Sequence, residues 1–288
     1  MEENGPFDMG NIDIAWCPGC GNFGILRALK RSLEDMALSP SDVVIVSGIG
    51  QAAKTPHYLR CHIFNGLHGR ALPPATAIKS VNPGLTVIAE SGDGDMFGEG
   101  GNHFIHAIRR NPDITNIVHD NMIYGLTKGQ ASPTSMEGME TPVQVSGVIL
   151  EPFNPLSTAI ALGAGFVART FSKDVEMTME VIKEAIRFKG YALVDILQPC
   201  VSFNRLNTFQ WFEEHTETID DDHDVKDRVE SFRLSLQRDP LPVGIFYKNG
   251  NREAYHDLLD AYKDIEDPLW NRVLDRREKL EKDIGELH

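Results

Sequence analysis

The sequence is poor in several features that define whole classes of protein. Its 288 residues include four cysteines and three tryptophans. Four cysteines in so long a chain do not make the dense disulfide framework of a small secreted domain. No run of about 18 apolar residues occurs, so no membrane-spanning helix is expected. The first residues lack the basic and apolar regions of a signal peptide, and a cytoplasmic protein is expected.

Basic clusters are missing as well. The chain has 28 Lys and Arg residues against 42 Asp and Glu, and its formal net charge is −14. A nucleic-acid-binding protein would need a basic patch, so no nucleic-acid partner is expected. The hydrophobic share of 41% is that of a globular protein. The length allows one large α/β domain, or a domain with an extension.

The most informative stretch runs from Leu85 to Asn102. Its pattern predicts a short strand over Leu85–Ala89, a glycine-rich turn over Gly92–Asp95 and a helix from about Gly100 to Arg110. Backbone N–H groups of such a turn can approach a phosphate closely, and the start of a helix adds partial positive charge. Aspartates in the turn can hold a hard divalent cation, which binds phosphate oxygens in turn. The stretch therefore indicates phosphate bound through a metal.

Two common phosphate-binding motifs are excluded here. No Gly-Lys-Ser/Thr follows the turn, so it is not a P-loop, and Gly-x-Gly-x-x-Gly does not occur in register after the strand. An ordinary connection between a strand and a helix stays open as an alternative interpretation.

A second strand is expected over Ile114–His119, followed directly by Asp120 and Asn121. In a parallel sheet both Asp93 and Asn121 would lie at the carboxyl ends of strands, where ligands gather. Gly-Asp-Gly followed by an Asn at the end of the next strand is the spacing of thiamine diphosphate enzymes. Two side-chain oxygens, a backbone carbonyl and the diphosphate would complete a Mg²⁺ site.

Two further motifs narrow the resemblance. The run Ile123–Thr134 (IYGLTKGQASPT) and the opening Trp16–Gly21 (WCPGCG) resemble the β subunit of the 2-oxoacid:ferredoxin oxidoreductases. The resemblance covers about residues 10 to 210, with the motifs in the family's order. It implies that Mg²⁺ is held by Asp93, Asn121 and the Ile123 carbonyl. It also implies cofactor-binding residues at Gly48, Ile49, His68, Gly92, Asp93, Gly94, Asp95, Asn121, Ile123, Tyr124, Gly125, Leu126 and Thr127.

Cys17 and Cys20 form a Cys-x-x-Cys loop. From the spacing alone, a redox pair, half of a zinc site and part of an iron–sulfur site are all open. The resemblance implies a [4Fe–4S] cluster with Cys17, Cys20 and Cys200 as ligands.

The fourth cluster ligand departs from the family pattern. The family has a cysteine in a Gly-Ile-Gly-Cys run, whereas this chain has Gly48-Ile-Gly-Gln51. Cluster ligation normally takes four thiolates. Three explanations are open: Gln51 or another group is a weak ligand, Cys61 takes the place, or the cluster is absent or altered. We favour a cluster with an unusual fourth site.

Substrate choice is partly readable. The resemblance places Lys54 and Lys128 where members acting on 2-oxoglutarate face the distal carboxylate, which slightly favours that substrate over pyruvate. Phosphate contact or plain surface exposure is the alternative for both lysines. His68 could contact phosphate or substrate, or could simply sit at the start of a helix with Arg70.

The alternation of strands and helices predicts an α/β fold, a doubly wound parallel sheet of the thiamine diphosphate-binding type with a C-terminal helical extension. Residues 1–206 form the expected cofactor domain, and residues 207–288 a lid or subunit-docking extension. Helices are expected at about residues 22–38, 68–80, 156–162, 175–188, 225–237, 252–263 and 266–287, and further strands at 42–48, 166–170, 191–197 and 243–247. Residues 57–67 and 125–155 are expected to be loops.

The implied reaction is the thiamine-dependent conversion of a 2-oxo acid and coenzyme A into acyl-CoA and CO₂, with electrons passed to ferredoxin, or the reverse. No glutamate here is marked as the activator of the aminopyrimidine, so the resemblance implies an α-type partner subunit that carries it in a pyrimidine domain. A dimer of such heterodimers is expected. The alternatives are half of a non-oxidative thiamine decarboxylase or ligase without a working cluster, and a non-enzymatic scaffold. The Gly92–Asn121 arrangement argues against the scaffold.

Overall fold

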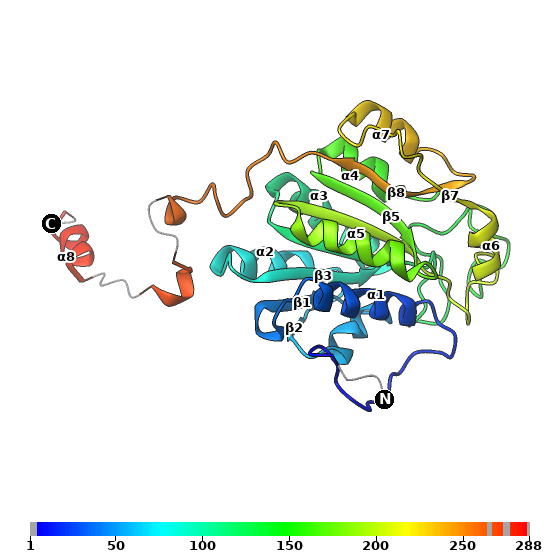
Figure 1. Cartoon of the computed structure of the whole chain (residues 1–288), viewed down its shortest axis with the longest axis horizontal. Coiled ribbons are helices and arrows are strands. Elements are labelled where there is room, and N and C mark those ends of the chain that lie inside the picture. The colour runs from blue at the N-terminus through cyan, green and yellow to red at the C-terminus, as the bar shows by residue number, and fades with distance from the viewer. Residues whose placement is uncertain (1–4, 264–266, 273–276, 287–288) are drawn as a thin grey trace.

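The computed structural model describes residues 5–263, 267–272 and 277–286. Its centre is an eight-stranded sheet in the order β2-β1-β3-β4-β6-β5-β8-β7. The strands are Val43–Ser47 (β1), His62–Asn65 (β2), Thr86–Gly92 (β3), Ile114–Asp120 (β4), Phe166–Phe171 (β5), Tyr191–Leu197 (β6), Thr216–Thr218 (β7) and Leu241–Lys248 (β8). Figure 1 shows the sheet running through the middle of the molecule.

The expected parallel sheet is confirmed. Strands β2, β1, β3, β4, β6 and β5 are parallel to their neighbours, whereas β8 is antiparallel to β5. Every residue of β1, β4, β5 and β6 is buried. These strands are mostly apolar or β-branched because helices cover both of their faces, with buried polar residues at a few positions of β4, β5 and β6.

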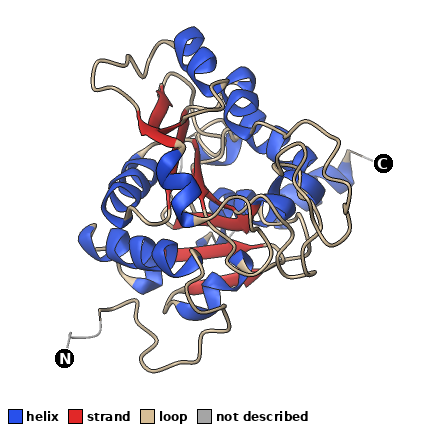
Figure 2. Cartoon of the chain, turned by 90° about the vertical axis from the view of Figure 1, so that its right-hand side faces the viewer, coloured by secondary structure: helices blue, strands red, loops and turns tan. Residues whose placement is uncertain are grey.

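Helices cover both faces of the sheet (Figure 2). On one face, Asn22–Asp35 (α1) and Val175–Arg187 (α5) bury their apolar sides against the sheet. On the other face lie Leu72–Val81 (α2), Gly101–Arg110 (α3) and Pro155–Leu162 (α4). The Asn154 and Asp174 side chains cap the starts of α4 and α5 by accepting backbone N–H bonds.

Three local expectations are corrected. Strand β3 continues to Gly92, and the glycine-rich segment Gly94–Glu99 is a π-helical turn that leads into α3. Residues 57–67 are not all loop, because the turn Ala52–Tyr58 (η2) and the edge strand β2 lie within or next to them. The helix expected at 68–80 begins only at Leu72.

The C-terminal part adds strands as well as helices. It contains Phe209–Glu214 (α6), β7, Arg228–Ser235 (α7) and β8, so it extends the sheet beyond β5. The helix expected over 252–263 is wrong, since only Asp260–Tyr262 (η4) forms a short 3₁₀ turn there. Within 266–287 the structure describes Leu269–Asn271 (η5) and Arg277–Gly285 (α8), and residues 266, 273–276 and 287 lie outside the described ones.

Residues 249–262 pack against the ends of helices. The Arg252 guanidinium donates to the carbonyls of Ile108, Arg109 and Gly163, where α3 and α4 end. The Tyr262 hydroxyl donates to Ser80 at the end of α2. In this fold the helices end at the amino-terminal edge of the sheet, so this segment lies on the edge opposite the strand carboxyl ends. Among the described residues, no helix is long and apolar enough to cross a bilayer.

Candidate functional site

The predicted site residues gather at one edge of the sheet. Strands β1, β3, β4 and β6 are successive parallel neighbours, so their carboxyl ends meet. Gly48, Asp93, Asn121 and Gln198 each follow one of these strands within a residue. The structure thus brings these predicted residues together at the strand carboxyl ends, the position at which α/β sheets bind ligands.

Two buried carboxylates face each other across one hydroxyl. The Thr134 Oγ1 lies 2.7 Å from Asp93 Oδ2 and 2.8 Å from Asp120 Oδ1. Both aspartates are 1% exposed. Burial raises the pKa of Asp93 to about 6. Hydrogen bonds from Ser132, Thr134 and backbone N–H groups lower this pKa, but burial outweighs them. A hydroxyl has a single proton and can donate to only one carboxylate at a time, so this pair favours a cation.

The charges around Asp93 and Asp120 also favour a bound cation. Burial, followed by the nearby Asp195 and Asp93 carboxylates, raises the pKa of Asp120. Arg169 Nε donates to Asp195 Oδ2 at 2.9 Å, while Asp195 Oδ1 has no hydrogen-bond partner. The buried Asp120 and Asp195 carboxylates therefore share one guanidinium, with the buried Asp93 carboxylate close to Asp120. Carboxylate and carbonyl oxygens are the ligands of Mg²⁺, so the residues present fit a divalent hard cation.

Asn121 is held from three sides. Its Oδ1 accepts the Ile123 N–H at 3.0 Å and its Nδ2 donates to Gln198 Oε1 at 3.2 Å. Asn204 Nδ2 donates to the Asn121 carbonyl at 3.0 Å. The Asn121 backbone N–H donates to Asp93. Asp93, Asn121 and Ile123, the three predicted Mg²⁺ ligands, thus come together, and their role as ligands stays a prediction.

The Asp95 side chain forms hydrogen bonds with the segment after β1 and with the segment before α2. Its Oδ1 accepts from Ile49 N at 3.1 Å and Gly69 N at 2.7 Å, and lies 2.5 Å from His68 Nδ1. A Cβ at Gly48 would collide with this carboxylate. Asp95 Oδ2 is buried without a hydrogen-bond partner. The structure therefore brings Gly48, Ile49 and His68 to the site, as the sequence predicted.

Tyr124 covers the glycine-rich turn. Its ring occupies the space that a Cβ at Gly94 would need, and its hydroxyl occupies the space that a Cβ at Gly98 would need. Its hydroxyl lies 3.2 Å from the Gly94 carbonyl and 3.1 Å from Glu99 Oε2. Burial and the Glu99 carboxylate raise the pKa of Tyr124. These glycines are therefore required for packing under the ring, whatever they also do for phosphate.

The remaining predicted residues of this motif form a turn after Tyr124. Gly129 N donates to the Tyr124 carbonyl at 2.8 Å, and Thr127 Oγ1 donates to Gln130 Oε1 at 2.5 Å. Leu126 is exposed at this turn, and Gly125 lies near Cys200. Contact of these residues with a cofactor stays a prediction.

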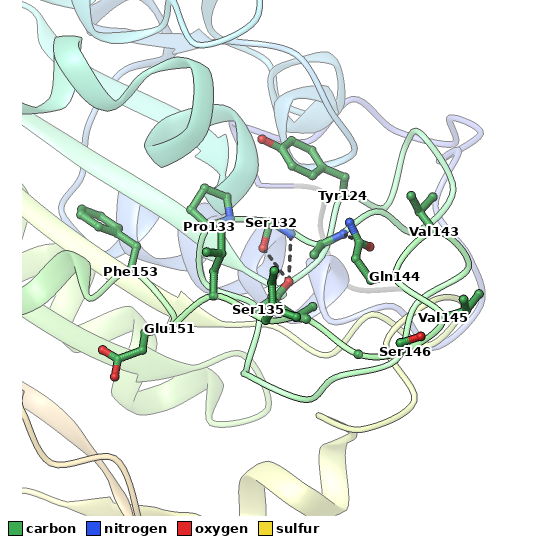
Figure 3. Close-up of a pocket in the computed structure, with 15 residues that line it drawn as sticks. Tyr124, Ser132, Pro133, Ser135, Val143, Gln144, Val145, Ser146, Glu151 and Phe153 are labelled. Carbon is green, nitrogen blue, oxygen red and sulfur yellow. Dashed lines mark hydrogen bonds between the residues drawn. The ribbon is translucent and has the colours of Figure 1, made fainter.

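A cavity of about 840 Å³ opens beside Tyr124 (Figure 3). Its wall includes Ser132, Phe153 and the long loop that follows β4. Ile149 is 85% exposed and Val145 73% exposed. Exposed apolar side chains of the loop lie along this cavity: Val143, Val145, Ile149 and Leu150.

Hydrogen bonds place Cys17 and Cys20 against residues 198–202, the segment that carries Cys200. Ser202 Oγ donates to Cys17 Sγ at 3.0 Å, and Gln198 Nε2 lies 3.5 Å from Cys20 Sγ. Burial raises the pKa of Cys20 to about 11, with smaller contributions from Cys200 and Cys17. Within the described residues, no three His, Cys, Asp or Glu side chains converge on a single metal ion. A mononuclear zinc site would need such convergence at about 2.3 Å, whereas thiolates of a cluster bind different irons.

The two candidates for a fourth ligand lie in different surroundings. Trp16 Nε1 donates to the Gln51 carbonyl at 2.8 Å, which places Gln51 against the cysteine loop. The Gln51 Oε1 is buried and has no hydrogen-bond partner. Cys61 precedes β2 and packs against the core. Burial raises the pKa of the Cys61 thiol to about 11, and a hydrogen bond with the Ile45 backbone offsets part of this rise.

The two lysines predicted to bind the substrate have no carboxylate partner among the described residues. Lys54 lies in η2, and its Nζ is 3.5 Å from the Ala15 carbonyl. Lys128 is exposed at the turn that follows Tyr124, with φ of 77°. Neither ammonium makes an ion pair within the part of the chain that the structure describes.

Sequence reasoning missed Asp120, Thr134 and the Arg169–Asp195 pair. Asp120 could have been found, because a carboxylate at the end of a fully buried strand is unusual. Thr134 could not, since the loop from Asn121 to Thr134 brings it back to the sheet by a path that no local pattern specifies.

Comparison with family models agrees with this geometry. Residues 45–196 match the model described as thiamine pyrophosphate enzyme, C-terminal TPP binding domain. Residues 200–264 match the model for the C-terminal part of the pyruvate ferredoxin oxidoreductase beta chain.

Relatives match over most of the chain. A 2-oxoacid:ferredoxin oxidoreductase subunit beta from Saccharolobus solfataricus is 44% identical over 258 residues, 85% of this chain and 85% of that protein. The 2-oxoglutarate oxidoreductase subunit KorB of Mycobacterium tuberculosis is 43% identical over 67% of this chain and 52% of its own length. A solved 2-oxoglutarate:ferredoxin oxidoreductase from Magnetococcus marinus, with 2-oxoglutarate, coenzyme A and succinyl-CoA bound, superposes with a TM-score of 0.89 at 32% identity over 98% of this chain and 97% of that chain. The chain belongs to the family of 2-oxoacid:ferredoxin oxidoreductase β subunits.

Proposed function

We propose that this subunit binds thiamine diphosphate through Mg²⁺ and, with an α-type partner, converts a 2-oxo acid and coenzyme A into acyl-CoA and CO₂ while ferredoxin takes up the electrons, or runs the reverse reaction. The observation that carries the proposal is the buried Asp93–Thr134–Asp120 arrangement at the strand carboxyl ends. Its unbalanced negative charge suits Mg²⁺, and the adjoining backbone suits a diphosphate.

Each site residue has a proposed task. Asp93, Asn121 and the Ile123 carbonyl would hold Mg²⁺, and Thr134 would orient Asp93. Asp95 would hold Ile49 and His68 in place beside the cofactor, through the bonds to its Oδ1. When bound, thiamine diphosphate supplies an electron sink that decarboxylation of a 2-oxo acid needs. The glutamate that activates it would come from the partner subunit.

Electron removal is assigned to a [4Fe–4S] cluster on Cys17, Cys20 and Cys200. The proposal is supported by the hydrogen bonds from Ser202 to Cys17 Sγ and from Gln198 to Cys20 Sγ, which place both thiols against the segment that carries Cys200. Of the two candidates for the fourth position we favour Gln51 over Cys61. Its unpartnered carboxamide oxygen and its contact with Trp16 support this choice.

2-Oxoglutarate is the proposed substrate. Lys54 and Lys128 offer two ammonium groups without carboxylate partners among the described residues, which suits a second carboxylate on the substrate. Relatives named for 2-oxoglutarate support the same choice.

The partner surface is proposed to include the loop after β4. Its exposed valines, isoleucine and leucine beside Tyr124 would be covered by the α-type subunit, next to the cofactor. Ferredoxin would dock near the exposed Cys17, and two heterodimers would associate. For the C-terminal segment we favour subunit docking over a lid, because Arg252 and Tyr262 anchor it at the opposite edge of the sheet.

The test combines one variant with its control. Asp93→Ala should abolish thiamine diphosphate binding and 2-oxo acid-dependent dye reduction, whereas Asp221→Ala, at an exposed position, should change neither. Tight cofactor binding by Asp93→Ala would sink the site assignment.

A further inference from the structure

The backbone is strained between two of the proposed Mg²⁺ ligands. Met122 separates Asn121 from Ile123 and has a φ of 57°, in the left-handed region of the backbone. This conformation is uncommon for a residue with a large side chain. Residues held in such conformations gather at functional sites, where the surrounding structure keeps them in place.

The other described non-glycine residues with positive φ have ordinary explanations. Ala37 and Asn111, with φ of 53° and 56°, follow the ends of α1 and α3, where a left-handed residue commonly closes a helix. Lys128 lies in the exposed turn after Tyr124. Met122 follows strand β4 instead, so the end of a helix does not explain its conformation.

Both backbone groups and the side chain of Met122 are held by contacts. Its N–H donates to Asp120 Oδ1 at 3.3 Å, and its carbonyl accepts the Ser135 hydroxyl at 2.5 Å. Its side chain is 7% exposed and packs in an apolar cluster. The other buried members of this cluster are Phe171, Leu197, Phe212 and Val243. The strained conformation is therefore fixed from all sides.

The conformation of Met122 determines how its two neighbours lie relative to each other. Asn121 Oδ1 accepts the Ile123 N–H at 3.0 Å, and this bond spans Met122. A rotation of the Met122 backbone would move the Ile123 carbonyl relative to the Asn121 side chain. Mg²⁺ requires near-ideal octahedral geometry, so its affinity for these two groups depends on the turn between them.

The loop after β4 ties this turn to the third proposed ligand. Ser132 N donates to Ser135 Oγ at 2.8 Å, so the hydroxyl that binds the Met122 carbonyl is itself fixed (Figure 3). Thr134, the neighbour of Ser135, lies 2.7 Å from Asp93 Oδ2. One short segment of the loop thus contacts both Asp93 and the Met122 turn.

We propose that Met122 is a positioning residue, whose left-handed backbone holds the Asn121 side chain and the Ile123 carbonyl in the arrangement that Mg²⁺ requires. The inference rests on the proposed function, because it assumes a Mg²⁺ site at these residues. Ligands that are held in place before the metal arrives lose less conformational freedom on binding. The strained turn therefore raises the affinity for Mg²⁺ with thiamine diphosphate.

The test is calorimetry of Mg²⁺-dependent thiamine diphosphate binding by the complex with its α-type partner. Glycine adopts positive φ readily, so Met122→Gly should stay near the affinity of the unmodified complex, although it loses the buried side chain and is less stable to denaturant. Valine is β-branched and resists positive φ. Met122→Val should therefore lower the affinity about 10–100-fold, the loss typical when the support of a metal ligand is removed.

A role in packing alone would give the opposite order, since glycine loses more apolar contact than valine. Binding by Met122→Gly that is equal to or weaker than binding by Met122→Val would overturn the inference. If Met122→Val does not fold, Met122→Ala replaces it. Alanine loses nearly the same contacts as glycine but keeps a Cβ, so it should bind more weakly than Met122→Gly, and equal affinities would overturn the inference.

The matched control is Ala37→Val. Ala37 is exposed and has a φ of 53°, so valine meets the same backbone strain there. Helix α1 begins beside the cysteine loop, and Ala37 follows its other end. This variant should lose stability to denaturant and keep its affinity for thiamine diphosphate with Mg²⁺. A loss of affinity as large as that of Met122→Val would reflect general destabilisation and would overturn the inference.

The outcome also separates this inference from the proposed function. An unmodified complex that does not bind thiamine diphosphate with Mg²⁺, or tight binding by Asp93→Ala, would overturn both. Normal binding that is lost in Asp93→Ala, without the expected order of the Met122 variants, would overturn only the inference.

Discussion

The Thr134 hydroxyl lies 2.7 Å from the buried Asp93 carboxylate. The same oxygen is 2.8 Å from Asp120. Thr134 is supplied by the loop after β4, whereas both carboxylates lie at the ends of buried strands. The loop therefore takes part in building the site, besides covering it.

Thr134→Val tests this contact, because valine keeps the shape of threonine and lacks the hydroxyl. Loss of an outer partner of a metal ligand typically costs about 10–100-fold in affinity. We expect such a loss in the affinity for thiamine diphosphate with Mg²⁺, measured by calorimetry. Thr158→Val, on α4, is the control and should bind normally. Equal affinities for the two variants would show that Thr134 does not orient Asp93.

Cofactor binding should depend on pH with a defined sign. Burial raises the pKa of Asp93 to about 6 in the cofactor-free chain. Mg²⁺ needs the ionised carboxylate, so protons compete with the metal below about pH 6. The affinity for Mg²⁺ should therefore fall as pH drops, by up to about tenfold per unit if one proton is released.

The raised pKa of Asp93 also affects the free energy of unfolding, but with the opposite dependence on pH. Between its ordinary value of 3.8 and about 6, folded Asp93 holds a proton that the unfolded chain has lost. The cofactor-free chain should thus lose stability as pH rises through this window. Denaturant titrations from pH 4 to 7 measure it, with Asp93→Asn as the control lacking the carboxylate. A slope that is identical in both proteins would contradict the assignment.

Gln51 offers a gain-of-ligand test. Gln51→Cys would supply a fourth thiolate beside Trp16, and the cluster should resist iron loss and oxidation better than in the unmodified chain. Gln51→Ala should weaken it, and Cys61→Ala should leave it unchanged. Iron content and EPR spectra measure these effects. Cluster loss in Cys61→Ala, with none in Gln51→Ala, would make Cys61 the fourth ligand.

The lysine pair tests the substrate. If both lysines bind the distal carboxylate as proposed, Lys54→Ala and Lys128→Ala would each remove a charged hydrogen bond worth about 1.5–3 kcal/mol. We expect the KM for 2-oxoglutarate to rise about 10–100-fold, with little change for monocarboxylic 2-oxo acids. Lys226→Ala, at an exposed position in another part of the chain, is the control. A uniform rise for all 2-oxo acids would point to phosphate contact instead.

Sequence patterns predicted the buried strands and missed the exposed ones. The run Val43–Ser47 is apolar because helices cover both faces, and this makes it readable. All of His62–Asn65 is exposed at the sheet edge, so no alternation marks it. The helix expected after Arg252 does not form, because that side chain binds carbonyls at the ends of α3 and α4.

Some residues of the candidate site could be predicted from the sequence and others could not. Asp93, Asn121 and Gly48 were predictable because strand ends are local features and parallel strands bring them together. Thr134, Arg169 and Asn204 act across long sequence separations through contacts that only the folded loops create.

The most direct measurement is dye reduction by the anaerobically purified complex with its α-type partner, across a panel of 2-oxo acids with coenzyme A. The account predicts viologen reduction that requires thiamine diphosphate, is fastest with 2-oxoglutarate and is lost in Asp93→Ala. Release of CO₂ without viologen reduction would contradict it, and would mean that Gln51 marks a lost cluster in a non-oxidative enzyme.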